Sequence, residues 1–246
     1  MLNFELYNPV RIIFGPGEAE NIGKYTKEYG TKAMLVTYDV HDFFNELLAK
    51  LDKSFKDAGV TVTEFFKVKP NPRLSDIEEA IDICRKEGIE VIVALGGGSV
   101  MDSAKAIGAG VKYDGDPWKM FVSRHDKAVA VPPTDTLPTI MIPTKSATSS
   151  ETNNVAVATN DRTHEKAYIW APVLYPKICV MDPCVTATLP KFPMAAGAVD
   201  AMSHVLEAYL NGDQNSPVQD RCHEGLLMAV MDLIRKIFKD PDDIQA

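Results

Sequence analysis

The stretch that decides the fold is EVIVALGGGSVMDSAKAIG at residues 90–108. It begins with a short apolar run, residues 91–95, of the kind that forms a strand buried on both faces. Three glycines follow, and residues 99–109 then show helical spacing of apolar side chains. A buried strand, a glycine turn and a helix in this order are typical of a parallel α/β sheet.

The same alternation continues toward the N-terminus. Strand-like runs occur as RIIF at 11–14, KAMLVT at 32–37 and VTVTEFF at 60–66. Helical stretches are predicted between these runs, at about 18–29, 42–58 and 75–87. Short apolar runs that alternate with amphipathic helices indicate parallel strands joined by crossover helices, so we predict an α/β fold.

The pattern changes twice toward the C-terminus. A Pro-, Asp- and Gly-rich excursion after residue 111 precedes a strand-like TIMIPT run, and VAVAT, AYIW and KICVM indicate further strands before residue 182. From residue 191 onward every signal is helical, with amphipathic helices predicted at 192–210 and 217–238. We therefore expect an α/β domain at 1–188 and the start of an all-helical domain at 189–246.

Composition limits the classes of function. The 246 residues carry 26 Lys and Arg against 34 Asp and Glu, a net charge of -8, which argues against a nucleic-acid partner. No apolar run approaches the ~18 residues of a membrane span, so no membrane association is expected. The N-terminus lacks the features of a signal peptide, and the scattered cysteines suggest a reduced, cytoplasmic protein. We interpret all four as packing residues: Cys84, Cys179, Cys184 and Cys222.

The glycine run is a candidate phosphate site. Gly96, Gly97 and Gly98 let a backbone approach a ligand closely, and the helix that opens at Ser99 offers unpaired N–H groups to a pyrophosphate. The alternative is a tight turn with Ser99 as an ordinary N-cap and Asp102 satisfying amides in the manner of a capping box. The run matches neither the GxGxxG fingerprint nor a P-loop, and no GxSxG elbow is present.

Two further groups of residues could bind ligands. The segment at 143–154, PTKSATSSETNN, presents small hydroxyls after a predicted strand, which suit phosphate, ribose or a nicotinamide amide, or form an ordinary loop: Thr144, Ser146, Thr148, Ser149 and Ser150. Asp200 and His204 are spaced i, i+4, so a helix places both on one face. This pair suits a divalent metal or a simple helix-surface hydrogen bond, and a catalytic metal needs a third ligand.

An ordered series of motifs resembles the iron-containing (group III) alcohol dehydrogenases, in particular their butanol dehydrogenase and aldehyde reductase branch. The likeness runs along the whole chain and includes RIIFGPGEAENIG, KPNP at 69–72, ALGGGSVMDSAKAIG, DPW at 116–118, IPTKSATSSETN, CVMDPCVTATLP and AGAVDAMSHVLEAYL. The resemblance implies an N-terminal parallel-sheet domain that binds NAD or NADP. It also implies a helical domain that holds iron or zinc, with the active site in the cleft between the domains.

The resemblance assigns roles to single residues. It implies that Gly96, Gly97, Gly98 and Ser99 hold the pyrophosphate, with Asp102 near the nicotinamide. The remaining assignments are Thr144, Thr148 and Ser149 at the nicotinamide and phosphate groups, Asn71 and Pro72 near the adenosine, and Asp200 and His204 as the first two metal ligands. The family's other two ligands are histidines farther along the helical domain, and this sequence ends before them. We therefore expect a truncated helical domain.

Cofactor choice is predicted from the residues after the second strand-like run. Asp39 and Asp42 stand where a 2′-phosphate would require Lys or Arg, and a carboxylate accepts hydrogen bonds from a free ribose 2′-hydroxyl. We therefore expect NAD to be preferred over NADP.

The predicted function is metal-dependent hydride transfer between a nicotinamide cofactor and a small primary alcohol or aldehyde, by a homodimer as the resemblance implies. One alternative is a catalytically incomplete nucleotide-binding or oligomerisation module. Another alternative is an enzyme of the same fold that acts on polyols or sugar phosphates. The absence of a cluster of basic residues near residues 200–204 argues against a phosphorylated substrate.

Overall fold

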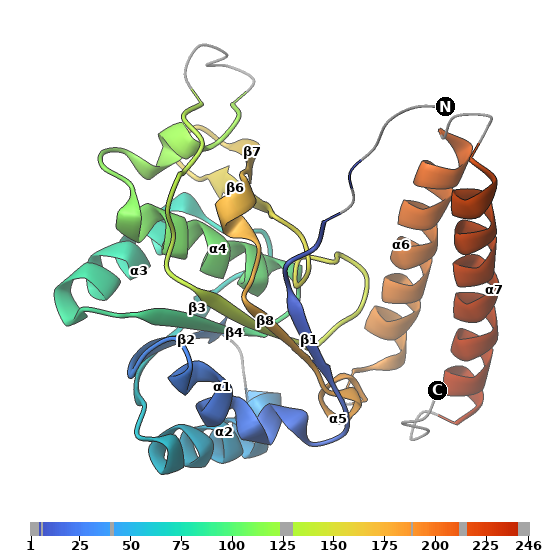
Figure 1. Cartoon of the computed structure of the whole chain (residues 1–246), viewed down its shortest axis with the longest axis horizontal. Coiled ribbons are helices and arrows are strands. Elements are labelled where there is room, and N and C mark those ends of the chain that lie inside the picture. The colour runs from blue at the N-terminus through green and yellow to red at the C-terminus, as the bar shows by residue number, and fades with distance from the viewer. Residues whose placement is uncertain are drawn as a thin grey trace. The chain divides into compact units, whose positions relative to one another are not determined.

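The structure is a computed structural model that describes residues 5, 7–39, 42–123, 130–187, 189–211 and 216–240 (Figure 1). It consists of two compact units. The sheet unit contains Asn8–Pro143 and Ser149–Asp182, and the helical unit contains Met1–Tyr7, Thr144–Thr148 and Pro183–Ala246. Thr188, the last residue of the expected α/β domain, lies outside the described residues.

The sheet unit is built on six parallel strands in the order β1-β8-β5-β4-β2-β3. The strands are β1 (Arg11–Phe14), β2 (Lys32–Tyr38), β3 (Thr61–Val68), β4 (Val91–Gly96), β5 (Thr139–Pro143) and β8 (Ile178–Met181). The predicted parallel α/β fold is confirmed. Every residue of β4 and β5 is buried, which explains their continuous apolar sequence in the middle of the sheet.

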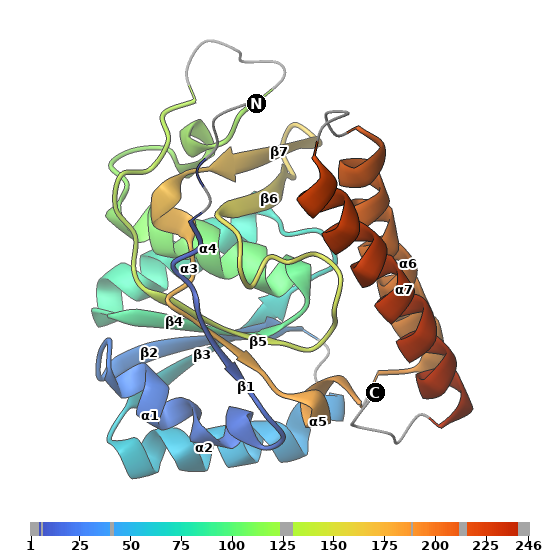
Figure 2. The ribbon, with the colours of Figure 1, turned by 45° about the vertical axis from the view of Figure 1, so that its right-hand side comes forward.

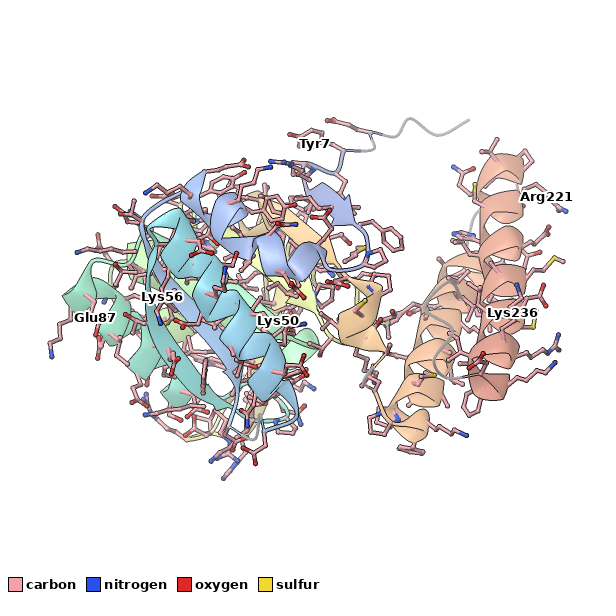
Figure 3. All side chains as sticks on the ribbon, turned by 90° about the horizontal axis from the view of Figure 1, so that it is seen from below. Tyr7, Lys50, Lys56, Glu87, Arg221 and Lys236 are labelled. Carbon is pink, nitrogen blue, oxygen red and sulfur yellow. The ribbon has the colours of Figure 1, made fainter. Side chains whose placement is uncertain are left out.

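Helices cover both faces of this sheet. Helices α1 (Ile22–Lys27) and α2 (Asn45–Ala58) lie on one face, and α3 (Leu74–Glu87) and α4 (Gly98–Lys112) lie on the other (Figures 1 and 2). Helix α2 buries Leu51 and Phe55 and points Lys50 and Lys56 outward (Figure 3). Short 3-10 helices occur at η1 (Glu18–Asn21), η2 (Asp42–Phe44), η3 (Pro117–Met120) and η4 (Pro172–Leu174).

Two of the predicted strands form a separate hairpin. β6 (Val155–Asn160) and β7 (Glu165–Trp170) pair antiparallel as a two-stranded sheet that packs over α4 (Figure 2). Ala167 and Ile169 of β7 are buried, whereas Tyr168 and Trp170 are exposed. This one-sided burial produces the alternating sequence pattern of a strand that covers a core with one face only.

The helical unit contains α5 (Pro183–Thr186), α6 (Lys191–Leu210) and α7 (Pro217–Lys239), with α6 and α7 side by side in both views (Figures 1 and 2). Gly197 is the one buried residue of α6, and α7 buries none. No helix among the residues that the structure describes is long and apolar enough to cross a membrane.

The cysteines divide into two classes. Cys84 and Cys179 are buried, as expected of packing residues. Cys184 and Cys222 are exposed, so their interpretation as packing residues is wrong. Both exposed cysteines lie in the helical unit, where few side chains are buried.

Candidate functional site

A crevice is expected where β2 and β4 lie side by side, because the chain leaves them toward opposite faces of the sheet. The connection after β2 leads to α2 on one face, and the connection after β4 leads to α4 on the other. Ligands of open α/β sheets bind at such a switch point, outside the carboxyl ends of the strands. Here Tyr38 ends β2, and its hydroxyl accepts a hydrogen bond of 2.9 Å from the backbone N–H of Gly97.

The first turn of α4 leaves backbone donors at this point. The helix has Gly97 as its N-cap, and the N–H groups of Val100 and Met101 donate to the Gly97 carbonyl at 3.0 and 3.1 Å. The N–H groups of Gly98 and Ser99 come before these bonds and have no carbonyl partner within the helix. They are suited to an anionic group such as a phosphate.

The capping alternative for this turn is wrong. Ser99 lies inside the helix, and the cap position carries no side-chain hydrogen bond. Asp102 does not accept from the first turn either. Its two carboxylate oxygens accept from the Ser150 hydroxyl at 2.6 Å and from the Val157 N–H at 3.0 Å.

Close packing explains the first glycine of the run. A Cβ at Gly96 would lie 2.5 Å from Cγ2 of Val100 and 3.2 Å from the Tyr38 ring. Since contacts below 3.0 Å do not persist, a side chain at residue 96 would push Val100 or Tyr38 away. The glycine therefore keeps the end of β4 close to both the Tyr38 ring and the first turn of α4.

Asn71 joins this group from the end of β3. Its backbone adopts a left-handed conformation with φ 63°, and its N–H donates to the Ser99 hydroxyl at 3.3 Å. Its side-chain oxygen accepts from Nζ of Lys166 at 3.0 Å. Pro72 is buried, and its carbonyl accepts from the Thr159 N–H at 2.7 Å, so Pro72 holds the loop against β6.

Asp102 is largely buried one turn into α4, and only 17% of its side chain is exposed. Burial raises the pKa of its carboxyl group, while the ammonium of Lys105 and the hydrogen bonds from Ser150 and Val157 act in the opposite direction. Lys166 also lowers this pKa through its charge. The exposed Lys166 thus brings a positive charge near the first turns of α4, which suits a site for a phosphorylated ligand.

Two residues of this group were missed by the sequence analysis. The sequence analysis ended the second strand at Thr37, before Tyr38, and began a later strand at Ala167, after Lys166, and it gave neither residue a role in the site. Lys166 lies on the outer face of β7, between the half-buried Glu165 and the buried Ala167. This alternation indicates an exposed side chain and gives no sign of a binding site. Only the pairing of β6 with β7 and the bridge from Arg73 to Thr159 bring Lys166 to Asn71.

The other predicted cofactor residues are distributed over both units. Asp39 is exposed directly after β2, and its N–H donates to the Val68 carbonyl at 3.2 Å. Ser149 belongs to the sheet unit and is exposed with φ 52°. Thr144, which is buried, and Thr148, which is exposed, belong to the helical unit.

Asp200 and His204 lie on one face of α6, as their spacing predicts. Oδ1 of Asp200 is 3.7 Å from Nε2 of His204, and both side chains are about half exposed. A carboxylate oxygen and an imidazole nitrogen at this separation can turn toward one divalent ion. The described part of the chain contains no group of three His, Cys, Asp or Glu side chains that could hold a metal, so this pair does not form a complete site within it.

Comparison with known proteins decides the family. Residues 9–183 match the family described as "Iron-containing alcohol dehydrogenase", and residues 194–246 match "Fe-containing alcohol dehydrogenase family, C-terminal". The chain belongs to the iron-containing alcohol dehydrogenase family. The resemblance inferred from the motif series is thereby confirmed.

Relatives within the family share the whole of this chain. A probable NADH-dependent butanol dehydrogenase of Bacillus subtilis is 39% identical over 100% of this chain, which spans 62% of that protein. An NADPH-dependent aldehyde reductase of Escherichia coli is 30% identical over 99% of this chain and 61% of its own length. The crystal structure of NADH-dependent butanol dehydrogenase A from Thermotoga maritima superposes with a TM-score of 0.89 at 38% identity, over 99% of this chain and 60% of that one.

Proposed function

We propose that this family member binds a nicotinamide dinucleotide and takes part in hydride transfer between that cofactor and a small primary alcohol or aldehyde. The observation that carries the proposal is the switch point between β2 and β4, where the N–H groups of Gly98 and Ser99 at the start of α4 have no carbonyl partner within the helix. The names of the relatives, which are alcohol dehydrogenases and aldehyde reductases, support the reaction class.

Different residues of the sheet unit would bind different parts of the cofactor. Gly96, Gly97, Gly98 and Ser99 would bind the pyrophosphate through backbone donors, and Asn71 and Pro72 would border the adenosine. Lys166 would add a positive charge beside Asn71. Asp102 and Ser149 would position the nicotinamide end. When bound, the nicotinamide supplies or accepts the hydride, and the protein supplies orientation and charge.

We propose NADH as the preferred cofactor. Asp39 is exposed at the end of β2, the strand beside β4. Its carboxylate would accept a hydrogen bond from a free 2′-hydroxyl and repel a 2′-phosphate. The Bacillus subtilis relative is described as NADH-dependent and the less similar Escherichia coli relative as NADPH-dependent, which agrees with this direction.

We propose that Asp200 and His204 are two ligands of a divalent metal, iron or zinc. Their separation of 3.7 Å fits chelation by one carboxylate oxygen and one imidazole nitrogen. A metal bound there would supply Lewis-acid polarisation of the substrate oxygen. Two ligands do not form a catalytic site, so any further ligands must come from outside the residues that the structure describes.

We further propose a cytoplasmic homodimer. β1 is an edge strand of the six-stranded sheet, and it exposes 53% of Ile12 and 72% of Phe14. An edge strand with apolar side chains favours pairing with a second copy of the chain. Sedimentation of the wild type and of Ile12→Lys, which should remove this contact, tests the dimer. An unchanged sedimentation coefficient would count against β1 as the interface.

The proposed function is tested with the purified chain. NADH and NADPH binding is measured by calorimetry, and butyraldehyde-dependent oxidation of NADH is followed anaerobically with added Fe(II) or Zn(II). His204→Ala should lose metal binding and retain NADH binding, whereas His164→Asn, at an exposed histidine of the β6–β7 turn, should change neither.

Each outcome has a distinct meaning. Turnover that requires the metal supports the complete proposal. NADH binding without turnover favours the alternative in which this chain is a nucleotide-binding module that lacks part of the metal site. If the folded wild type binds neither NADH nor NADPH, the proposal is wrong.

A further inference from the structure

Lys105 is a fully buried cation in the middle of α4. Its side chain is 0% exposed, which is rare for lysine unless the ammonium is paired. Nζ donates to the carbonyl of Ser150 at 2.8 Å and to the side-chain oxygen of Asn153 at 3.0 Å, and it also bonds the carbonyl of Val155. All of these acceptors come from residues 150–155, the segment that leads into β6.

This segment has no regular backbone pairing of its own before β6 begins. Ser149, which precedes it, has φ 52°, a conformation that costs free energy in a residue other than glycine. The carbonyl oxygens of Ser150, Asn153 and Val155 converge on the ammonium of Lys105. Without that ammonium, several buried oxygens would lose their donor, and each would cost about 1–3 kcal/mol.

Asp102 holds the same segment through its donors. It accepts from the Ser150 hydroxyl and from the Val157 N–H, and it lies three residues before Lys105 on α4. Its Oδ1 is 3.9 Å from Nζ of Lys105. The two side chains are complementary, because Asp102 binds the N–H and O–H groups of the segment and Lys105 binds its oxygens.

We propose that Lys105 is a positioning residue for the cofactor site, and that it acts by clamping residues 150–157 to the first turns of α4 and by holding Asp102 in place. The inference rests on the proposed cofactor function. Ser99 and Asp102 lie on the first turns of the same helix, and Ser149 directly precedes the clamped segment. Lys105 reaches these residues without facing the ligand itself, since its side chain is enclosed by protein.

The test compares Lys105→Met, which keeps the length and removes the charge, with two controls on α4. Lys112→Met removes an exposed lysine, and Ile107→Val trims a fully buried core residue without touching the clamp. NADH affinity is measured by calorimetry well below the melting temperature of every variant. Hydrogen exchange of the backbone amides is measured on the same samples.

We expect Lys105→Met to weaken NADH binding by about tenfold or more, equivalent to ~1.4 kcal/mol, while both controls remain within about twofold. We also expect faster exchange confined to residues 149–157, with β2 and β4 unchanged. A loss of stability alone, as expected for Ile107→Val, would lower the melting temperature without these two changes.

Two results would overturn the proposal. One is NADH affinity in Lys105→Met within about twofold of the wild type. The other is unchanged exchange at residues 149–157, and this measurement remains decisive even if the wild type binds no NADH. In that case the proposed function fails by itself, and the exchange data decide whether the clamp exists. If Lys105→Met does not fold, Lys105→Gln, which keeps two donors, is measured in its place.

Discussion

Asp39 and Tyr38 are neighbours at the end of β2, yet they act in different ways. The Tyr38 hydroxyl is bound to Gly97, and burial raises its pKa, so it remains a neutral hydrogen-bonding group. Asp39 is exposed. At the residue scale, therefore, Tyr38 shapes the glycine turn, while Asp39 lies exposed directly after β2, where we expect it to discriminate between cofactors.

Asp39→Ser should narrow the preference for NADH over NADPH by about tenfold, because it removes a carboxylate that repels a 2′-phosphate. The ratio of the two dissociation constants, measured by calorimetry, checks this expectation. Asp82→Ser, at an exposed acid on α3, is the matched control and should leave the ratio unchanged. An unaltered ratio in Asp39→Ser would show that other residues select the cofactor.

The charge of Lys105 links stability to pH. Burial lowers the pKa of this ammonium to about 8, although the carboxylates of Asp102 and Glu151 act in the opposite direction. The ordinary value is 10.5. Between these pH values the unfolded chain binds more protons than the folded chain, so the contribution of Lys105 to the free energy of unfolding rises with pH.

Urea unfolding of the wild type and Lys105→Met at about pH 7 and about pH 10 measures this contribution. The free energy of unfolding of the wild type minus that of the variant should be larger at the higher pH. Other titrating groups largely cancel, because they are common to both chains. A difference that falls as the pH rises would contradict a lowered pKa for Lys105.

At the element scale, α1 and α2 approach each other closely through one glycine. A Cβ at Gly23 would lie 2.0 Å from the carbonyl oxygen of Ser54, and the Gly23 N–H donates to the Ser54 hydroxyl at 3.0 Å. The obstacle is backbone, which cannot rotate away as a side chain can. The packing of these two helices on one face of the sheet therefore depends on the absence of a side chain at residue 23.

Gly23→Ala should lower the free energy of unfolding by about 1–3 kcal/mol, because α1 must move away from α2. Gly225→Ala is the matched control, since nothing lies within 4 Å of a Cβ at that exposed position of α7. That change should be neutral or stabilising by up to ~1 kcal/mol. Equal effects of the two variants in urea unfolding would argue against close packing at Gly23.

At the scale of the whole molecule, the two units differ in how much they bury. The strands at the centre of the sheet are fully buried, whereas α7 buries no residue and exposes 72% of Val218 and 53% of Leu226. Figure 3 shows Arg221 and Lys236 also projecting from α7. Because helical stability comes mainly from packing of an apolar face, the helical unit should be the less stable of the two.

Hydrogen exchange should reveal this difference. Amides of α6 and α7 should exchange at least about tenfold faster than those of β4 and β2, since local opening costs less where few apolar contacts are broken. The same exposed apolar side chains should bind a hydrophobic dye in the folded chain. Uniform protection across both units would show that the chain unfolds as a single cooperative body.

Local patterns in the sequence determined the elements and the family. The run at residues 90–108 contains its strand, turn and helix within 19 residues. The continuous apolar run of the strand and the 3.6-residue period of the helix can be recognised without a partner. The ordered motif series identified the family, and the i, i+4 spacing placed Asp200 and His204 on one helix face because helix geometry is local.

Only the tertiary structure decided which distant residues meet. The contacts of Lys166 with Asn71, of Tyr38 with Gly97 and of Lys105 with residues 150–155 join positions 45 or more residues apart. They depend on strand order, register and the antiparallel pairing of β6 with β7, none of which has a periodic signature in the chain. Lys105 and Lys166 therefore look alike in the sequence, although the fold buries the first and exposes the second.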